Sequence, residues 1–522
     1  MTEEKIKGQS DNETAINSDE EELNSEQLNE LRQVRREKLK KLQESGRDPF
    51  LNEFWDVTAY SKDIKESYEE AETKTPEGET PDTGEISVAG RIMAFRHMGK
   101  ASFIDILDKQ GRIQLYVRKD AIGEEAYEDF VSYDIGDIIG AVGTVFRTRH
   151  GEISVKTSKI VLLTKSLQIL PNKWQGLKDQ DIRYRQRYVD LIMNPEVRET
   201  FVKRAAIIKE IKRYLEDDEG FLEVDTPILT TIAGGANARP FDTHHNTLDI
   251  DMKLRISNEL YLKRCTVGGL DRVYEMGKMF RNEGMDRNHN PEFTSMELYQ
   301  AYGQMEDVMR ITENVVSKAA LKATGSMVIN YQGKTFDLTP PWERLSMTDA
   351  IKRWAGVDFS TIKDDEEARQ LAKEHGFEDW KKLNRGLVIA EFVEKFCEDH
   401  LEGPMFLTGH PVEISPLSKR DPDDPRITRR FEAYINTWEI ANGFSELNDP
   451  IDQYQRFKDQ QEQLDSGDEE AHPMDEDFVN ALEVGLPPTG GLGIGIDRVI
   501  MLITDSPSIR DIILFPTMKP LD

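Results

Sequence analysis

The chain has 522 residues, with 98 aspartates and glutamates against 68 lysines and arginines, and a formal net charge of −30. This length predicts roughly two to four domains, and the sequence contains no apolar run of the length that spans a bilayer. The negative charge repels nucleic acid over most of the surface, so such a partner needs a local basic or specific site. The N-terminus lacks the basic and apolar regions of a signal peptide. Cys265 and Cys397 match neither a metal spacing nor a disulfide framework, and we expect a cytoplasmic protein.

Residues 1–24 are polar, acidic and poor in aromatics, which predicts an acidic disordered tail. A helix is predicted from Ser25, a residue that favours the N-cap, because leucines recur on one side as far as Leu42. Arginines and lysines occupy the rest of this helix and form a dense basic patch. Two interpretations of the patch stay open, a solvated helix face or a binding surface for phosphates.

Five short β-rich runs follow between about Ile86 and Thr164, separated by glycine or polar turns. They predict a five-stranded OB-type β-barrel, so residues 25–165 form the N-terminal helix and barrel domain. Such barrels bind single-stranded nucleic acid on one face, where aromatic rings stack on bases. Phe103 and Gln114 fall on consecutive strands, where they are placed to stack on a base and to hydrogen-bond to it. A purely structural barrel with Phe103 in its core is the alternative.

A connector over residues 166–195 leads into a long amphipathic helix and then into a mixture of strands and helices, with a helical insertion at about 347–401. Three motifs occur in this last part: EGFLEVDTPIL (219–229), YEMGKMFRNEGMDRNHNPEF (274–293) and GLGIGIDRVIML (491–502). The first predicts a helix end at Gly220 and a strand that runs into Pro227. Because proline cannot donate to a ladder, this strand belongs at a sheet edge or an interface.

The second motif predicts an antiparallel hairpin with a wide tip, which presents four functional side chains toward one side: Arg281, Glu283, His289 and Phe293. In the third motif, glycines alternate with apolar residues before Asp497 and Arg498. Glycine at every second position of a strand indicates the close approach of a ligand or another backbone. A dinucleotide-binding loop would need a βαβ unit with a later acidic residue, which does not follow here. A glycine-rich core strand is the remaining alternative.

Together the three motifs resemble the signature motifs of class II aminoacyl-tRNA synthetases. With an N-terminal OB barrel, the chain resembles the subgroup of aspartyl, asparaginyl and lysyl enzymes, and in detail the bacterial-type class II lysyl-tRNA synthetase family. The resemblance extends from about Leu28 to Pro520, and Asp497 fits the narrower subgroup. The blocks that carry it are AGGANARPFDTHHNTLDIDMKLRISNELYLKR, RNHNPEFTSMELYQAY, WEIANGFSELNDP and GLPPTGGLGIGIDR. It implies an α+β chain in which residues 196–522 form a class II catalytic domain, built on an antiparallel sheet flanked by helices.

Such an enzyme activates L-lysine with ATP to lysyl-adenylate and transfers lysine to the 3′ end of tRNA(Lys), releasing pyrophosphate and AMP. No protein nucleophile is needed, because the protein positions the reactants and stabilises charge. The resemblance implies two catalytic arginines, Arg281 at the α-phosphate and Arg498 at the γ-phosphate, where planar guanidinium groups suit phosphate. The implied ATP site consists of Arg281, Glu283, His289, Asn290, Phe293, Glu439 and Arg498.

Mg²⁺ is the implied cofactor, and Glu439 and Glu446 are its expected ligands, although each could be a surface glutamate on a strand. The implied lysine pocket consists of Gly235, Glu259, Glu297, Tyr299, Asn442 and Phe444. The aspartyl enzymes carry a lysine close after the residue that matches Glu259. The corresponding residues 260–262 are uncharged here, which favours a cationic substrate.

For the barrel, the resemblance implies an anticodon-binding site of Arg91, Phe103, Gln114 and Glu152. It also implies a homodimer, with the interface at the first motif, and no membrane partner. Three alternatives stay open. One is a synthetase for aspartate or asparagine, against which Glu259 and Glu297 argue. The others are a non-catalytic paralogue, which would have lost Arg281 or Arg498, and a protein-modifying lysine ligase, whose relatives lack the barrel.

Overall fold

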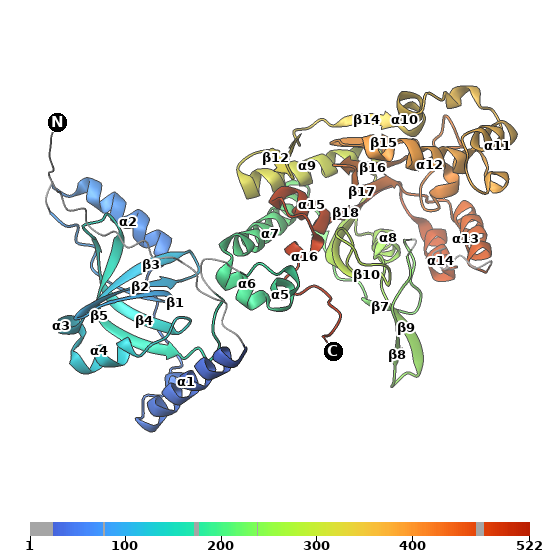
Figure 1. Ribbon diagram of the computed structural model, residues 1–522. Coiled ribbons are helices and arrows are strands. Elements are labelled where there is room, and N and C mark those ends of the chain that lie inside the picture. Colours follow the sequence, from blue (N-terminus) through green and yellow to red (C-terminus); the bar gives the residue numbers. More distant parts are fainter. Residues whose placement is uncertain (1–24, 77–78, 172–176, 237, 466–473, 522) are drawn as a thin grey trace, which may run out of the picture. The chain divides into compact units, whose positions relative to one another are not determined.

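The computed structural model describes residues 25–76, 79–171, 177–236, 238–465 and 474–521. The chain divides into two compact units, residues 1–175 and 176–522 (Figure 1). The predicted acidic tail, residues 1–24, lies outside the described residues. Within the described ranges, no helix has both the length and the apolar character needed to cross a bilayer.

A closed barrel forms the core of the first unit, and its strands neighbour one another in the order β1-β2-β3-β5-β4. The strands are β1 (Glu85–Met98), β2 (Ala101–Leu107), β3 (Arg112–Arg118), β4 (Ile138–Arg147) and β5 (Ile153–Thr164). In β2 and β3 every second residue is buried, which is the alternation expected when one face of a strand meets a core. Between β3 and β4 lie α3 (Lys119–Ile122) and α4 (Glu124–Val131), whose Tyr127 and Phe130 join the barrel core. The predicted five-stranded OB-type barrel is confirmed.

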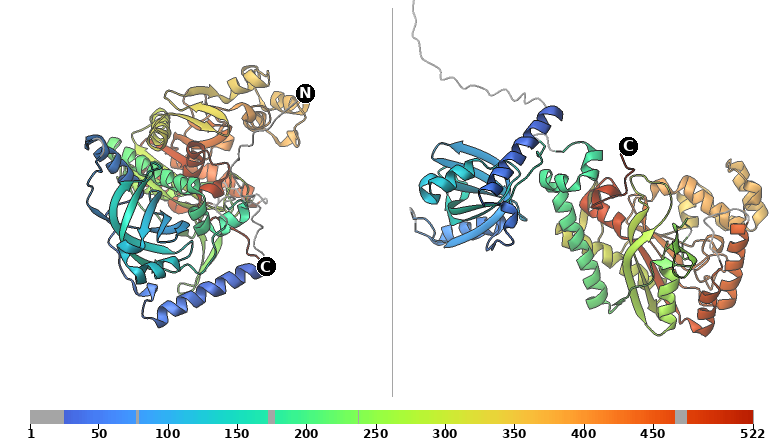
Figure 2. Two further views of the ribbon diagram at one scale, coloured as in Figure 1. Left: turned by 60° about the vertical axis from the view of Figure 1, so that its left-hand side comes forward. Right: turned by 90° about the horizontal axis from the view of Figure 1, so that it is seen from below.

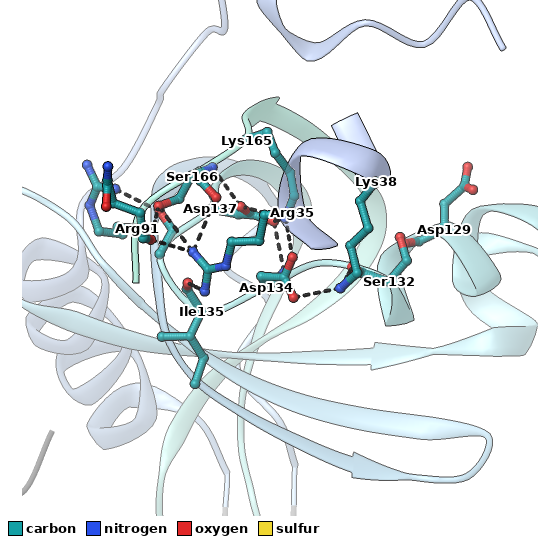
Figure 3. A network of polar contacts seen from close by, with 12 residues as sticks. Arg35, Lys38, Arg91, Asp129, Ser132, Asp134, Ile135, Asp137, Lys165 and Ser166 are labelled. Carbon is teal, nitrogen blue, oxygen red and sulfur yellow. Dashed lines mark hydrogen bonds and ion pairs between the residues drawn. The ribbon is translucent and has the colours of Figure 1, made fainter. Parts of the chain in front are cut away.

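Helix α1 (Ser25–Glu44) lies along the outside of the barrel (Figure 2), followed by a 3-10 turn (Pro49–Leu51) and α2 (Ser61–Lys74). Figure 3 shows how α1 is held. The Arg35 guanidinium donates to the backbone carbonyls of Ile135 (2.9 Å), Ser166 (3.2 Å) and Gln168 (2.6 Å). Lys38 pairs with Asp134 at 2.7 Å. Part of the basic patch is therefore structural, whereas the side chains of residues 36, 40 and 41 stay exposed.

The second unit is built on an eight-stranded sheet with the order β14-β15-β16-β17-β18-β11-β10-β6. The strands in that order are Glu343–Ser346, Met405–Thr408, Arg430–Ile435, Trp438–Ser445, Thr489–Gly495, Glu292–Ala301, Arg272–Phe280 and Leu222–Glu223. Neighbours are antiparallel except at the two edges, where β14 pairs with β15 and β6 with β10 in parallel. The predicted antiparallel sheet is thus confirmed, and the strand before Pro227 is the short edge strand β6.

Helices cover both faces of this sheet (Figure 1). On one face, α7 (Pro195–Arg213), α9 (Met305–Thr324) and α15 (Ile496–Thr504) form a large apolar core with the strands. On the other, α8 (Glu259–Val267) packs against β10 and β11, and α13 (Pro450–Asp465) and α14 (Glu476–Gly485) pack against α8. A π-helical turn (Tyr214–Asp218) extends α7 until Gly220, whose φ of +72° favours glycine. The third motif forms the predicted strand and buried helix, β18 and α15.

Smaller elements complete the unit. The connector region contains α5 (Gln180–Arg185) and α6 (Arg187–Met193). Strands β7 (Leu229–Thr230), β8 (Asp242–His245) and β9 (Ile250–Leu254) form a separate small sheet, and β12 (Val328–Tyr331) pairs with β13 (Lys334–Asp337). Between β14 and β15 lie α10 (Met347–Trp354), α11 (Asp365–Glu374) and α12 (Arg385–Phe396), with a core of their own. Short helical turns occur at Phe359–Thr361, Trp380–Lys382, Glu398–His400 and Val412–Ile414, and α16 is Ile509–Ile512.

The contacts of Arg35 predict that it anchors α1. Arg35→Met leaves three carbonyl groups without this donor, so the free energy of opening of α1 should fall by about 2–4 kcal/mol. Hydrogen exchange of the α1 amides, measured by mass spectrometry on the full chain, checks this value. Arg36→Met is the matched control and should change it by less than about 0.5 kcal/mol, because residue 36 is exposed. Equal protection in both variants would remove the assigned role of Arg35.

Candidate active site

A cavity of about 430 Å³ opens in the second unit, where strands β11, β16, β17 and β18 meet the loop after β10 and the starts of α8 and α15. This volume falls in the range of small-molecule sites, roughly 300–1,000 Å³. All predicted ATP-binding and lysine-binding residues line it: Gly235, Glu259, Arg281, Glu283, His289, Asn290, Phe293, Glu297, Tyr299, Glu439, Asn442, Phe444 and Arg498. The lining does not include Glu446, the second predicted metal ligand. The fold thus brings the second and third motifs to one cavity.

Arg281 lies where the β10–β11 hairpin opens into its wide tip, and its backbone N–H donates to the Pro291 carbonyl at 2.9 Å. Its guanidinium lies 5.2 Å from the centre of the Phe293 ring. The Nε atom is buried and has no hydrogen-bond partner among the described residues. Burial lowers the pKa of Arg281, and the carboxylates of Glu283, Glu297 and Glu439 partly offset this. A buried cation that is not fully hydrogen-bonded is suited to bind an anionic group.

Arg498 reaches the same cavity from the first turn of α15. It donates to the Glu439 carbonyl at 2.5 Å and to Nε2 of His289 at 3.1 Å. The other ring nitrogen of His289, Nδ1, lies 2.8 Å from the Asp286 carboxylate. The hairpin imidazole and the helix guanidinium therefore lie side by side, a pairing that suits neighbouring phosphate oxygens.

Asp497 is buried beside Arg498 and ties three elements together. Its carboxylate accepts from Arg204 of α7 and from the backbone N–H of Thr294 in β11, both at 2.7 Å. Arg204 also donates to the Thr294 hydroxyl at 3.1 Å. Asp497 therefore fixes the start of α15 against β11, and with it the position of Arg498 relative to Phe293.

The alternating glycines of β18 have two different functions. A Cβ at Gly491 would lie 1.8 Å from Oε1 of Glu446 and 2.7 Å from the Tyr299 ring, so this position must stay empty. At Gly493 and Gly495 the nearest atoms would be 3.8 Å and 3.7 Å away. These two glycines leave open floor in the cavity, whereas Gly491 makes room for two buried side chains.

The opposite end of the cavity is rich in carboxylates. Glu297 accepts from Ser257 at 2.9 Å and from Tyr299 at 3.2 Å. Burial, and then the nearby charge of Glu259, raise the pKa of Glu297 to about 7. Gly235 borders this end with a φ of +89°, and a Cβ there would lie 2.7 Å from Oγ of Ser257. A side chain at position 235 would therefore displace the donor that orients Glu297.

A buried ammonium group that the sequence analysis missed lies beside these carboxylates. Lys263 is fully buried and ion-paired with Glu259 at 2.5 Å and with Glu446. Burial disfavours its charge, but the two carboxylates more than offset this and raise the pKa of Lys263. Lys263 follows directly after the uncharged residues 260–262, and it shares one helix face with Glu259 because the two residues are four apart. Three acidic side chains (Glu259, Glu297, Glu446) surround this one ammonium, so the excess of acidic groups that favours a cationic substrate remains.

The predicted metal pair of Glu439 and Glu446 does not fit one ion. Strand β17 separates the two residues, and seven residues of strand span about 20 Å. Two ligands of one Mg²⁺ lie only about 3–4 Å apart. Glu432 of β16 lies nearer to Glu439. Asn442 of β17 pairs with Glu432 across the strands. A β-bulge opposite Ala433 and Tyr434 turns Glu439 to the same face of the sheet as Asn442. Both Glu432 and Glu439 line the cavity.

The four predicted anticodon residues lie in the first unit but not all together. Phe103 stacks on Tyr116 with ring centres 4.8 Å apart, and Gln114 shares their face of the barrel. Glu152 lies just before β5 and is exposed. Arg91 lies opposite Leu107, about 13 Å along β2 from Phe103, and it donates to the Gly136 carbonyl at 2.7 Å (Figure 3).

The arginine beside Phe103 is Arg96, which pairs with it across the strands. Its side chain is 62% exposed. Cross-strand register therefore identifies a basic residue on the aromatic face that sequence spacing alone did not identify.

Comparison with known proteins agrees with this geometry. Residues 179–519 match the family model "tRNA synthetases class II (D, K and N)", and residues 86–163 match "OB-fold nucleic acid binding domain". The catalytic unit is thus of the class II tRNA synthetase type.

Individual relatives narrow the assignment. A lysine–tRNA ligase of Thermoanaerobacter pseudethanolicus is 57% identical over 497 residues, which cover 95% of this chain and 97% of the relative. Lysine–tRNA ligases of Syntrophomonas wolfei and Clostridium botulinum are 55% and 54% identical, over 94% and 95% of this chain and 98% and 97% of the relatives. The chain belongs to the lysine–tRNA ligase family.

The contacts of Asp497 predict a large effect of a small change. Asp497→Asn removes the charge that pairs with Arg204, so the free energy of unfolding should fall by about 3 kcal/mol, with a loss of kcat of at least about tenfold. Denaturant unfolding and lysine-dependent ATP–pyrophosphate exchange measure the two effects. Asp505→Asn is the matched control, because asparagine tolerates its positive φ and keeps an acceptor for Gln332. An Asp497→Asn variant with normal stability and normal exchange would refute the positioning role.

Proposed function

We propose that the chain attaches lysine to tRNA(Lys) in two steps at the cavity of the second unit, in the cytoplasm. One observation carries this proposal: a carboxylate-rich end and an arginine-rich end share one cavity with an open glycine floor. A cationic amino acid suits the first end and ATP suits the second. The carboxylate of the amino acid then meets the α-phosphate between them.

In the first step, a lysine carboxylate oxygen attacks the α-phosphorus of ATP. A P–O bond forms, the bond to the β-phosphate bridge breaks, and pyrophosphate leaves with the electron pair. No proton has to move, so side chains contribute position and charge. Arg281 is suited to the α-phosphate, because it lines the cavity and its buried Nε has no hydrogen-bond partner among the described residues. Arg498 and His289 bind the departing phosphates, and the adenine stacks on Phe293.

The remaining ATP residues lie at the hairpin tip. Asn290 is buried, and its Oδ1 has no hydrogen-bond partner among the described residues. Glu283 lines the cavity at its exposed edge. We assign the two residues to polar contacts with the nucleotide.

The ammonium groups of lysine bind at the other end. Glu259 and Glu297 line the cavity, and Tyr299, Asn442 and Phe444 complete the walls. We also assign Glu446 to this end, because its Oε1 is buried without a hydrogen-bond partner in the described part of the chain and lies over Gly491. In this proposal Glu446 serves the amino acid rather than the metal.

The residues present fit Mg²⁺ at Glu432 and Glu439. Both face the cavity, and burial, followed by the charge of Glu432, raises the pKa of Glu439 to about 7. The described residues contain no cluster of three or more metal-ligating side chains, so phosphate oxygens and water would complete the shell. When bound, Mg²⁺ supplies positive charge that shields the phosphates.

In the second step, a hydroxyl of the terminal ribose attacks the lysyl carbonyl, and an ester C–O bond forms. The bond between the carbonyl carbon and the phosphate oxygen breaks, AMP leaves with the electron pair, and the hydroxyl proton is released. Recognition of the anticodon falls to the barrel face with Phe103, Tyr116 and Gln114. Arg96 adds positive charge there, and Arg91 and Glu152 remain candidate anticodon-binding residues. A chain of net charge −30 needs such a local site to bind an RNA.

A homodimer through the first motif is also part of the proposal. Leu222, Ile228 and Leu229 expose 52%, 45% and 46% of their surface, and Leu248 of the neighbouring hairpin exposes 64%. Exposed apolar side chains along the first motif favour an interface there. Sedimentation of the full chain should find a dimer, and Leu229→Asp should shift it to a monomer.

The pKa of Glu297 predicts a pH dependence. Burial keeps Glu297 protonated up to about pH 7, and the substrate ammonium needs the ionised form. The value of kcat/KM for lysine should therefore rise with pH through about 7 and level off above it. Glu297→Gln should remove this limb and lower kcat/KM for lysine about 100-fold or more, with little change in the KM of ATP.

Pyrophosphate exchange at a series of pH values measures both effects, with aspartate and asparagine as control substrates. Equal losses for lysine and ATP would remove Glu297 from the amino-acid site. Exchange with aspartate or asparagine but not lysine would overturn the proposed substrate.

The barrel face predicts a separable effect on tRNA. Loss of one stacking ring costs about 1–3 kcal/mol, so Phe103→Ala should lower kcat/KM for tRNA about 5- to 150-fold while pyrophosphate exchange stays within about twofold. Charging of total tRNA measures the first value. Phe50→Ala is the matched control, a half-exposed ring of the same unit. Arg96→Ala should weaken charging more than Arg91→Ala, and the reverse order would favour Arg91 as the reader.

A further inference from the structure

The side chain of Lys263 is surrounded on every side by groups that favour a cation. Its Nζ pairs with Glu259 at 2.5 Å and with Glu446. Three aromatic rings complete the cage, with centres 5.8 Å (Tyr299), 5.5 Å (Phe444) and 5.8 Å (Phe478) from Nζ. The side chain has no exposed surface, so the ammonium is a permanent part of the interior.

The same groups that hold Lys263 also form the amino-acid end of the cavity. Glu259, Tyr299 and Phe444 line the cavity. Glu446 touches Lys263 through Oε2, while its Oε1 has no hydrogen-bond partner among the described residues and lies over Gly491. Glu259 is therefore shared between the resident ammonium and the cavity, whereas Glu446 lies just behind the lining, with its Oε1 over Gly491, which lines the cavity.

Without Lys263, three carboxylates would face one another in a buried region, and such groups repel and become protonated. With it, Glu259 and Glu446 are fixed to one point on the rigid helix α8. Lys263 therefore holds the two carboxylates in place, and its positive charge limits the negative charge of the pocket.

We propose that Lys263 is a specificity-determining positioning residue for the amino-acid substrate. Its ammonium holds Glu259 and Glu446 in the arrangement that binds the substrate's side-chain ammonium, and it does not itself contact the reacting atoms. This inference rests on the proposed function and adds the residue that organises its lysine pocket.

Lys263→Met keeps the length of the side chain and removes the charge. We expect the KM of lysine in ATP–pyrophosphate exchange to rise at least tenfold, while the KM of ATP stays within about twofold. Lys334→Met is the matched control, because Lys334 forms a surface ion pair with Glu402 at 2.8 Å and is 53% exposed. It should leave both KM values unchanged.

Chemical rescue separates positioning from mere stability. Lys263→Ala leaves a space between carboxylates and rings that suits a small amine, so methylammonium or ethylammonium should lower the KM of lysine toward the wild-type value. Tetramethylammonium, which is larger and cannot donate a hydrogen bond, should have no effect. The wild-type chain should not respond to any of the three.

The outcomes are distinct. If Lys263→Met and Lys263→Ala are folded by circular dichroism and keep the wild-type KM of lysine, the inference is overturned. If neither folds, the double variant Lys263→Met with Glu446→Gln removes both charges. A folded double variant with the wild-type KM of lysine, or one that fails to fold as well, overturns the inference in favour of a structural role. If the wild-type chain shows no lysine-dependent exchange, the proposed function itself fails, whatever Lys263 does.

Discussion

Burial of carboxylates around one cavity is the constraint on which the rest of the catalytic unit depends. Burial raises the pKa of Glu297 and Glu439 to about 7 and that of Glu446 well above its usual range. Charged groups away from water need partners or lose their charge. The fold supplies only part of these partners, namely hydroxyl donors for Glu297 and the Lys263 ammonium for Glu446. A cationic amino acid and a metal–nucleotide complex can supply the positive charge that these buried carboxylates still lack.

Rigid elements hold these charged groups in place. The strand order explains why residues from distant segments of the sequence line one cavity. Strand β18 lies between β11 and β17, so the glycine floor separates the strand that carries Glu297 from the strand that carries Glu439. Asp497 then fixes α15 to β11 and α7. Because these supports are backbone ladders and buried ion pairs, the positions of Arg281 and Arg498 are set before any ligand arrives, as preorganised catalysis requires.

The barrel and most residues of the cavity could be predicted from sequence, because short local motifs contain them. Alternating strands predicted the barrel, and the resemblance of the motifs to class II synthetases implied that Arg281, Phe293 and Arg498 share one site. The misplaced residues share one cause: their positions depend on three-dimensional neighbours. Glu439 and Glu446 look close in sequence, yet an extended strand separates them, and the cross-strand neighbour Glu432 comes from another segment. Lys263 lies one helical turn after its partner Glu259, but its second partner, Glu446, comes from a distant segment, so the sequence alone does not show that the three side chains meet.

The two units differ in the charge of the ligands that they suit. The catalytic unit concentrates negative charge inside and admits cations, whereas the barrel must hold a polyanion on a chain whose net charge is −30. Its aromatic face, with Phe103 stacked on Tyr116 and Phe146 beside Tyr116, offers stacking energy that does not depend on attracting phosphates from afar. Arg96 adds a local positive charge next to the rings. On an acidic protein, bulk repulsion opposes every RNA alike, so binding depends on short-range stacking and on the local charge of Arg96 rather than on long-range attraction.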